Sequence, residues 1–287
     1  MVTIRLFEPK DVNFAAELIR QEKWGHTAKD VRRCWNFEPE GCFIAEQDGE
    51  RVGHVFSVNY STVGWIGLLI IQQSYRGQGI GTTLMRTAMN YLRNLGVETI
   101  RLEAVPEAVT LYQRLGFKSE FDSLRFYREL RPGRTCLQAK DEEIHQIKDD
   151  ELEILGKFDA ECFGANRLKV LQGLYRDFPQ HCLVARNDGI MGYIMCRETN
   201  SGFWLGPWVC EEEHPEVARD LIVSFLHALK ANSGLCVGIP APNTMGIQLL
   251  EKLDFSLMSR SIRMFWGKPA YSGNAKENFG IGGPEKG

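Results

Sequence analysis

Four short sequence landmarks recur in the second half of this chain at a nearly constant distance from their first occurrence. The pairs are Asp48-Gly49 with Asp188-Gly189, Val52-Gly53 with Met191-Gly192, Trp65-Ile66-Gly67 with Trp204-Leu205-Gly206, and Leu115-Gly116-Phe117 with Leu253-Asp254-Phe255. Their offsets are 140, 139, 139 and 138 residues. A slowly shrinking offset is typical of a tandem duplication with small deletions, whereas chance matches scatter. We therefore expect two related domains in one chain.

The length of 287 residues agrees with two domains of ordinary size. The stretch 131–134, Arg-Pro-Gly-Arg, breaks the pattern of the first repeat, and an acidic, polar stretch follows it. The tail holds five glycines and two prolines but few apolar residues, so we expect it to be mobile or draped over the surface. The predicted ranges are 1–130 for the first domain, 131–140 for a linker, 141–268 for the second domain and 269–287 for the tail.

Apolar periodicity and turn residues predict an α/β fold, with a mixed, mostly antiparallel sheet flanked by helices. Asp48-Gly49 is typical of a hairpin turn, and Gly96 suits the left-handed end of a long helix. The predicted elements of the first repeat are strands at 2–6, 42–46, 52–59, 65–71, 97–102 and near 118–128, with helices at 11–23, 28–36, 79–94 and 107–115.

Charge and composition exclude several classes of protein. The net charge is −3, so the chain lacks the broad basic field that unspecific binding to nucleic acid or to anionic membranes needs. Its longest apolar run, 63–71, is about half of the roughly 20 residues that a membrane-spanning helix requires. The first residues do not resemble a secretory signal, and we therefore expect a cytoplasmic protein.

The eight cysteines are spread along the chain without any C-x-x-C pair. This spacing does not suit a metal site, and the chain is too large to need a disulfide framework. We expect buried, reduced thiols and no metal.

The most informative motif is a glycine-rich turn between a predicted strand and a predicted helix. Gly77, Gly79 and Gly81 alternate there, which lets successive backbone N–H groups converge on an anion without interfering side chains. The start of a helix adds unpaired amides and a positive dipole end. The Lys-Ser/Thr of a P-loop is missing, and the preceding strand belongs to a hairpin, so Walker and Rossmann motifs both fit badly. The pattern favours a diphosphate group as the ligand.

Two stretches of the first repeat resemble signatures of the GNAT superfamily of N-acetyltransferases. Arg76-x-x-Gly79-x-Gly81, after an apolar strand and before Leu84-Met85, looks like the acetyl-CoA signature of that superfamily. The later run from Ala108 through Tyr112 to Gly116-Phe117 matches its second signature. The second half resembles the carboxy-terminal GNAT-like domain of certain two-domain bacterial acetyltransferases, through the stretches 163–167, 206–208 and 263–264. The resemblance implies a tandem GNAT fold.

The resemblance also implies which residues bind acetyl-CoA, the expected co-substrate. The strand residues Leu69, Ile70 and Ile71 would pair with the pantetheine amides through their backbone. The loop would hold the pyrophosphate by its main-chain N–H groups, and it comprises Arg76, Gly77, Gln78, Gly79, Ile80, Gly81 and Thr82. Val105 and Pro106 occupy a region where the family often has a cofactor-binding Asn, so that contact is lost or replaced.

Tyr112 falls where the family has a phenol near the thioester sulfur, acting as general acid for the departing thiolate. A phenol with a pKa of about 10 is protonated at neutral pH and can donate to a thiolate whose pKa is near 8.5. The alternative is a tyrosine that only packs in the core of a short amphipathic helix.

The acceptor amine must reach the thioester as a free base, so a carboxylate or a water chain should remove its proton. Glu103 is our first candidate for the base, with His54 and Tyr60 as alternatives. A surface role for Glu103 is an equally good interpretation, because direct attack in a ternary complex needs orientation more than covalent catalysis. Small metabolites, antibiotics, peptide termini and protein lysines are all compatible acceptors.

The second repeat lacks the features that carry chemistry in the first. Glu211, Glu212 and Glu213 stand where a multiply charged anion would bind, with no glycine at the equivalent loop positions. The counterpart of Tyr112 is Leu250. We therefore expect catalysis in the first repeat only. The alternative is a binding module that senses acyl-CoA without turnover.

Overall fold

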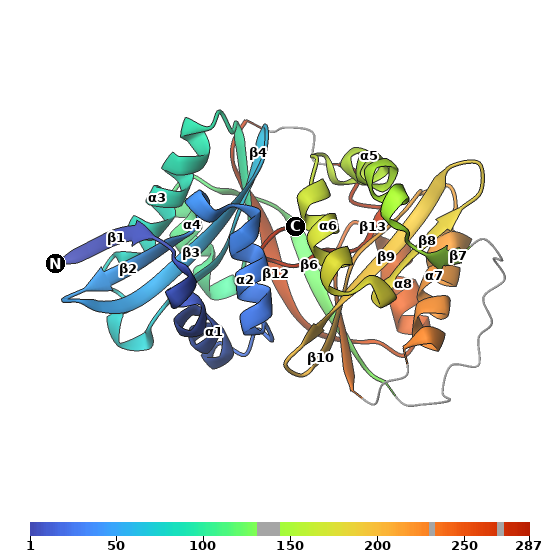
Figure 1. Ribbon diagram of the computed structural model, residues 1–287, viewed down its shortest axis with the longest axis horizontal. Helices are drawn as coiled ribbons and strands as arrows, with labels where there is room; N and C mark the ends of the chain where they lie inside the picture. Colours follow the sequence, from blue (N-terminus) through green and yellow to red (C-terminus); the bar gives the residue numbers. More distant parts are fainter. Residues whose placement is uncertain (131–143, 230–232, 269–272) are drawn as a thin grey trace. The chain divides into compact units, whose positions relative to one another are not determined.

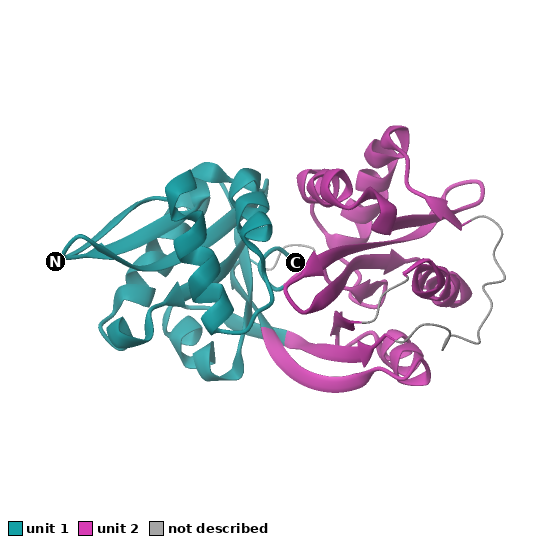
Figure 2. Ribbon diagram, turned by 60° about the horizontal axis from the view of Figure 1, so that its bottom comes forward, with its two compact units in different colours: residues 1–120, 263–270, 284–287 teal, residues 121–262, 271–283 magenta. Residues whose placement is uncertain are grey.

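A computed structural model describes residues 1–130, 144–229, 233–268 and 273–287. The described residues form two compact units (Figure 2). Unit 1 comprises residues 1–120, 263–270 and 284–287, and unit 2 comprises residues 121–262 and 271–283. The predicted linker, 131–140, lies outside the described residues.

Unit 1 contains the elements that the sequence predicts for the first repeat, apart from most of the final strand (Figure 1). Its strands are β1 (Val2–Leu6), β2 (Phe43–Gln47), β3 (Glu50–Tyr60), β4 (Val63–Ile71) and β5 (Thr99–Ala104). Its helices are α1 (Val12–Gln21), α2 (Ala28–Phe37), α3 (Ile80–Asn94) and α4 (Val109–Arg114). The order β1-β2-β3-β4 is antiparallel throughout, and β5 is parallel to β4 because the crossover helix α3 connects them.

Helices cover both faces of this sheet. Helix α3 packs on β2, β3 and β4, and its Leu92 lies against Gly64, where an added Cβ would be 2.8 Å from the leucine. Helices α1 and α2 pack on β3 from the opposite face, where Phe14 of α1 contacts His54 with ring centroids 6.5 Å apart. Thr27 caps α2 by accepting from Asp30 N, whereas the N-cap residue of α3 is Gly79, which has no side chain to cap the helix.

Unit 2 repeats this order of elements. Its strands are β7 (Ile144–Gln146), β8 (Cys182–Arg186), β9 (Ile190–Thr199), β10 (Gly202–Cys210), β11 (Gly234–Pro240) and β13 (Asn278–Gly280). Its helices are α5 (Leu152–Phe163), α6 (Leu168–Asp177), α7 (Pro215–Ala228) and α8 (Thr244–Lys252). As in unit 1, the parallel pair β10 and β11 is connected by a helix, here α7.

The final strands of the two repeats are exchanged. Strand β6 (Lys118–Glu129) ends the first repeat, but it pairs with β11 of unit 2, from Ser123 opposite Pro240 to Glu129 opposite Gly234. Strand β12 (Ser256–Gly267) ends the second repeat, but it is the neighbour of β5 and its last residues belong to unit 1. The compact units therefore differ from the predicted ranges 1–130 and 141–268. Most of β6, from the first repeat, belongs to unit 2, and the end of β12, from the second repeat, belongs to unit 1.

The segment after β12 is not a loose tail as far as the structure describes it. Phe279 and Ile281 of this segment are only 1% and 2% exposed, and Phe279 stacks on Trp208 at 5.2 Å between ring centroids. The prediction of a mobile or surface-draped tail is wrong for residues 278–287, because a few apolar side chains anchor a glycine-rich backbone in the core.

Other sequence predictions concern thiols, metals and membranes. The seven cysteines that the structure describes are free, six of them buried and Cys236 half-buried, as predicted. Across the described ranges there is no group of three or more His, Cys, Asp or Glu side chains that could hold a metal ion. No helix in those ranges is both long and apolar enough to cross a membrane.

Candidate functional site

Strand β4 leaves an open edge where β5 diverges from it. The pairing between the two strands covers Val63–Trp65, opposite Thr99–Arg101, and stops there. On its other side β4 remains paired with β3 as far as Ile71. The edge of β4 beyond Trp65 therefore offers backbone N–H and C=O groups to a further extended chain. We call the space beside this edge the β4 slot.

A bulge at Leu68 reverses the faces to which the β4 side chains point. Leu68 has a φ of +48°, and the register with β3 shifts between His54 and Phe56. Before the bulge, Gly67 faces away from α3. Beyond the bulge, Ile71 points toward α3, with its Cγ1 3.7 Å from a Cβ added at Gly81. Ile71 therefore joins the end of the β4 slot to the start of α3.

The glycine-rich loop has the conformation that an anion-binding turn requires. Gly77 and Gly79 have φ values of +79° and +83°, and an added Cβ at either residue would meet nothing within 4 Å. These glycines therefore permit a left-handed backbone conformation and leave the space beside it open, and close packing does not require them. Helix α3 starts at Ile80, and its first amides, through Thr82, have no partner within the helix. The loop presents unpaired N–H groups and a helix dipole to one open surface.

Arg76 closes this loop onto β4. Its Nε donates to the carbonyl oxygen of Ile71 at 2.9 Å, and its guanidinium pairs with Glu22, which follows α1. The side chain is half exposed. Gln78 lies in the same loop and donates to the carbonyl oxygen of Ser74 at 3.4 Å. Arg76 thus has a structural role that the sequence did not reveal, and a contact to phosphate remains a prediction.

The two predicted catalytic residues lie on β5 and on the helix that follows it. Glu103 is half-buried, and strand alternation puts it on the same face as Arg101. Tyr112 of α4 is 9% exposed and packs on Phe117 with ring centroids 6.0 Å apart. Burial raises the pKa of Tyr112 to about 12, so its hydroxyl is protonated across the physiological pH range.

Both alternatives to Glu103 as base are shielded. His54 is fully buried, and burial lowers its pKa to about 4, so the ring is neutral at neutral pH. Tyr60 is 3% exposed, and its Oη donates to the carbonyl oxygen of Lys286 at 2.9 Å. Of the three candidates, Glu103 is the most accessible.

Sequence reasoning missed a buried charged cluster at the point where β4 and β5 part. Arg101 Nε lies 3.4 Å from Glu120 Oε1, and Arg263 Nε lies 3.5 Å from Glu120 Oε2. The guanidinium of Arg263 stacks over Trp65 at 4.8 Å. The available signal was Arg101, a charged residue inside a predicted strand. The cluster brings together residues that are far apart in the chain.

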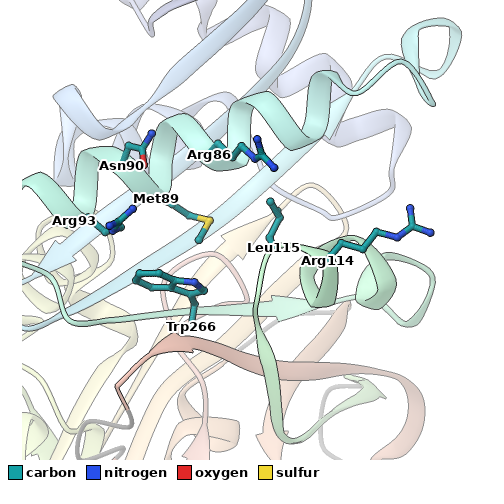
Figure 3. A pocket seen from close by; sticks show the side chains of 7 residues that line it. All are labelled: Arg86, Met89, Asn90, Arg93, Arg114, Leu115 and Trp266. Atoms are coloured by element: carbon teal, nitrogen blue, oxygen red, sulfur yellow. The ribbon is translucent and has the colours of Figure 1, made fainter.

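A cavity of about 320 Å³ lies between α3, α4 and the end of β12, as Figure 3 shows. Arg86 and Arg93 reach it from α3, Arg114 from α4, and Trp266 from β12. Arg93 stacks over Trp266 at 5.3 Å. Arginine side chains and an indole ring in the lining suit a ligand that combines negative charge with an aromatic group. In Figure 3 the guanidinium of Arg114 points away from those of Arg86 and Arg93.

In unit 2 the space equivalent to the β4 slot is filled by the chain itself. Strand β10 pairs with β11 over Gly202–Leu205, and beyond that point β13 pairs with β10 instead. Asn243 Nδ2 donates to the carbonyl oxygen of Asn278 in β13 at 3.1 Å. Glu212, which follows β10, pairs with Lys276 at 2.9 Å. An acidic turn and an inserted strand thus replace the glycine loop and the open edge of unit 1.

Comparison with known proteins identifies the family. Residues 11–117 match the model of the acetyltransferase (GNAT) family, and residues 155–280 match a second model, an acetyltransferase (GNAT) domain. Fold, loop and family models together define an acyltransferase. The chain belongs to the GNAT family and carries two GNAT domains in tandem, as the sequence predicted.

Named relatives agree with this assignment. Holothin acyltransferase from Pseudoalteromonas sp. is 24% identical over 249 residues, 86% of this chain and 82% of its own length. N-alpha-acetyltransferase 30 from Schizosaccharomyces pombe is 31% identical over 136 residues, 44% of this chain and 91% of its own length. Mycothiol acetyltransferase from Thermomonospora curvata is 34% identical over 131 residues, covering 40% of this chain and 44% of that protein.

Solved structures share the fold. A putative acetyltransferase from Pyrococcus horikoshii matches with a TM-score of 0.82 and 23% identity, covering 100% of this chain and 96% of that one. A tandem GNAT protein from the clavulanic acid biosynthesis pathway matches with a TM-score of 0.66 and 14% identity, covering 94% of this chain and 100% of that one.

Proposed function

We propose that unit 1 transfers an acetyl group from acetyl-CoA to a primary amine by direct attack in a ternary complex, and that unit 2 has no catalytic role. One observation carries this proposal. The β4 slot of unit 1 is open and ends at a glycine loop, whereas β13 fills the equivalent space in unit 2. A cofactor that binds as an extra strand therefore has one site among the residues that the structure describes.

The residues of unit 1 fit acetyl-CoA. The backbone of Leu69 and Ile71 borders the slot and would pair with the pantetheine amides. The amides from Gly77 to Thr82 would bind the pyrophosphate, and the open space beside Gly77 and Gly79 leaves room for it. Arg86 lies four residues beyond Thr82 on α3, about 6 Å along the helix axis. The cavity that it shares with Arg114 would suit the nucleotide 3′-phosphate.

When bound, acetyl-CoA supplies a thioester whose carbonyl carbon the amine attacks. Glu103 would accept the proton that the attacking amine loses. Tyr112 would donate a hydrogen bond to the sulfur as the C–S bond breaks. A phenol with a pKa near 12 is a weaker acid than a thiol with a pKa near 8.5, so full proton transfer is uphill. We therefore assign Tyr112 the stabilisation of the departing thiolate, and solvent completes its protonation.

The acceptor is a primary amine of a small molecule or of a protein. The names of relatives, a holothin acyltransferase, a mycothiol acetyltransferase and an N-alpha-acetyltransferase, support an amine acceptor but do not select one. An amine library is therefore the appropriate probe.

Release of free thiol from acetyl-CoA in the presence of such a library tests the proposal. Gly79→Glu puts a carboxylate and strain into the loop and should abolish release. Gly49→Glu is the matched control, because Gly49 has a φ of +84° and equally open surroundings but lies in the β2–β3 hairpin. Acetyl-CoA binding without thiol release from any amine would instead indicate an acyl-CoA-binding module.

A further inference from the structure

The segment Pro284–Gly287 belongs to unit 1 (Figure 2, teal), and its residues 285–287 are buried. Tyr60 Oη of β3 donates to the carbonyl oxygen of Lys286 at 2.9 Å, and Trp65 Nε1 of β4 donates to that of Pro284 at 2.9 Å. Two side chains of the sheet thus hold the main chain of the segment by its carbonyl groups. We call Pro284–Gly287 the strap.

The strap carries its charges into the interior. Glu285 is 4% exposed and Lys286 is 1% exposed, and the two side chains form an ion pair. Glu285 Oε2 also lies 3.3 Å from His26 Nε2, in the connection between α1 and α2. Burial raises the pKa of the Cys34 thiol on α2 to about 11, and the nearby Lys286 opposes this rise. A buried charge is tolerated only with partners, so the strap occupies a defined site rather than an incidental surface.

Gly67 makes room for the strap. A Cβ added at Gly67 would lie 2.4 Å from Glu285 Cα and 2.8 Å from the Glu285 carbonyl oxygen. Both are backbone atoms, so a side chain at this position cannot be accommodated by rotation. The face of β4 at Gly67 is therefore shaped for the close approach of an extended main chain.

The location of the strap relates it to the proposed reaction. Trp65 is the last residue of β4 that pairs with β5, and Gly67 lies two residues further, immediately before the bulge at Leu68. The strap thus lies where the β4 slot begins, on the face that carries α1 and α2. Helix α3 and its glycine loop border the slot from the opposite face. With a cofactor bound along Leu69–Ile71, the face that carries α1 and α2 would remain available to the acceptor.

We propose that the strap is an intramolecular occupant of the acceptor site, and that an acceptor binds only when the strap leaves. This inference rests on the proposed function, because it assigns the acceptor to the face opposite the glycine loop. The site accepts a peptide-like chain that offers carbonyl groups to Tyr60 and Trp65. The tethered strap competes with any acceptor at a high effective concentration and lowers the basal activity.

The test uses the full chain and a labelled peptide with the sequence Gly-Pro-Glu-Lys-Gly, which reproduces residues 283–287. Lys286→Glu puts two carboxylates side by side in a buried site and should expel the strap. Lys276→Glu is the matched control, because Lys276 is 60% exposed and its substitution makes the same change in charge. Fluorescence anisotropy should show that Lys286→Glu binds the peptide at least tenfold more tightly than the wild type and Lys276→Glu.

Saturating acetyl-CoA should leave peptide binding to Lys286→Glu intact, because the two sites lie on opposite faces. Equal binding by all three proteins, binding by none, or displacement of the peptide by acetyl-CoA would overturn the inference. If circular dichroism shows that Lys286→Glu is unfolded, the double variant Glu285→Ala/Lys286→Ala replaces it with the same expectation. Calorimetry with acetyl-CoA on the wild type tests the proposed function separately, since its failure leaves the peptide result unaffected.

Discussion

Substitution of Tyr112 by phenylalanine removes one hydroxyl group and leaves the buried ring on Phe117 in position. A hydrogen bond to a charged group contributes about 1.5–3 kcal/mol. At about 1.4 kcal/mol for each factor of ten, losing this bond to the departing thiolate lowers kcat about 10- to 150-fold. The Kd for acetyl-CoA should change by less than about twofold, because the proposed pyrophosphate and pantetheine contacts do not involve Tyr112.

The assay is thiol release between pH 6 and pH 10, with calorimetry for the Kd. Because burial holds the pKa of Tyr112 at about 12, its hydroxyl does not titrate in this range. The ratio of wild-type to Tyr112→Phe rates should therefore be independent of pH. Tyr127→Phe is the control for loss of a hydroxyl, because Tyr127 is 38% exposed on β6. An unchanged kcat, or a loss confined to acetyl-CoA affinity, would refute the role of Tyr112.

Three further predictions test the cavity, the buried histidine and the inserted strand. Arg86→Gln and Arg114→Gln should each weaken the binding of CoA about tenfold but leave dephospho-CoA binding unchanged, and calorimetry with the two ligands checks this. His54 has a pKa of about 4 when folded and about 6.5 when unfolded, so the unfolded state binds more protons as the pH falls through this window. As the pH falls from 7.5 to 5, protonation of His54 in the unfolded state should lower the free energy of unfolding by about 2 kcal/mol. Urea titrations of His54→Phe should show a decrease in the free energy of unfolding that is smaller by this amount. Phe279→Ala should lower the free energy of unfolding by about 3–5 kcal/mol, because the ring is 1% exposed. The affinity for acetyl-CoA should not change. Equal melting curves for the variant and the wild type would argue against the burial of β13.

The elements of the first repeat could be predicted from the sequence because their signals are local. The apolar run that predicts a strand at 65–71 and the glycine-rich turn that predicts the start of a helix both depend on neighbouring residues, and the structure contains β4 and α3 there. The duplication was also visible, since related repeats keep their spacing. The two GNAT domains confirm that interpretation.

The exchange of final strands could not be predicted in this way. The sequence of β6 predicts a strand, but nothing local indicates that its partner is β11 rather than β5. The same limit applies to β13, where five glycines and two prolines in the tail suggest a loose segment. Its strand forms because β10 has an open edge to pair with, which only the folded chain reveals.

The candidate site likewise contains one part that the sequence predicts and another part that only the structure shows. The loop from Gly77 to Thr82 was identified because an anion-binding turn requires glycines at fixed spacing. The contact between Gly67 and Glu285 joins residues 218 positions apart, and neither residue type is unusual in its local sequence. Contacts of that range hold the strap on the proposed acceptor side and are visible only in the structure.

Calorimetric titration of the full chain with acetyl-CoA tests the central claim most directly. The account predicts one acetyl-CoA per chain, with binding abolished in Gly79→Glu and retained in Gly49→Glu. Two molecules per chain, or undiminished binding by Gly79→Glu, would contradict the assignment of a single cofactor site to unit 1.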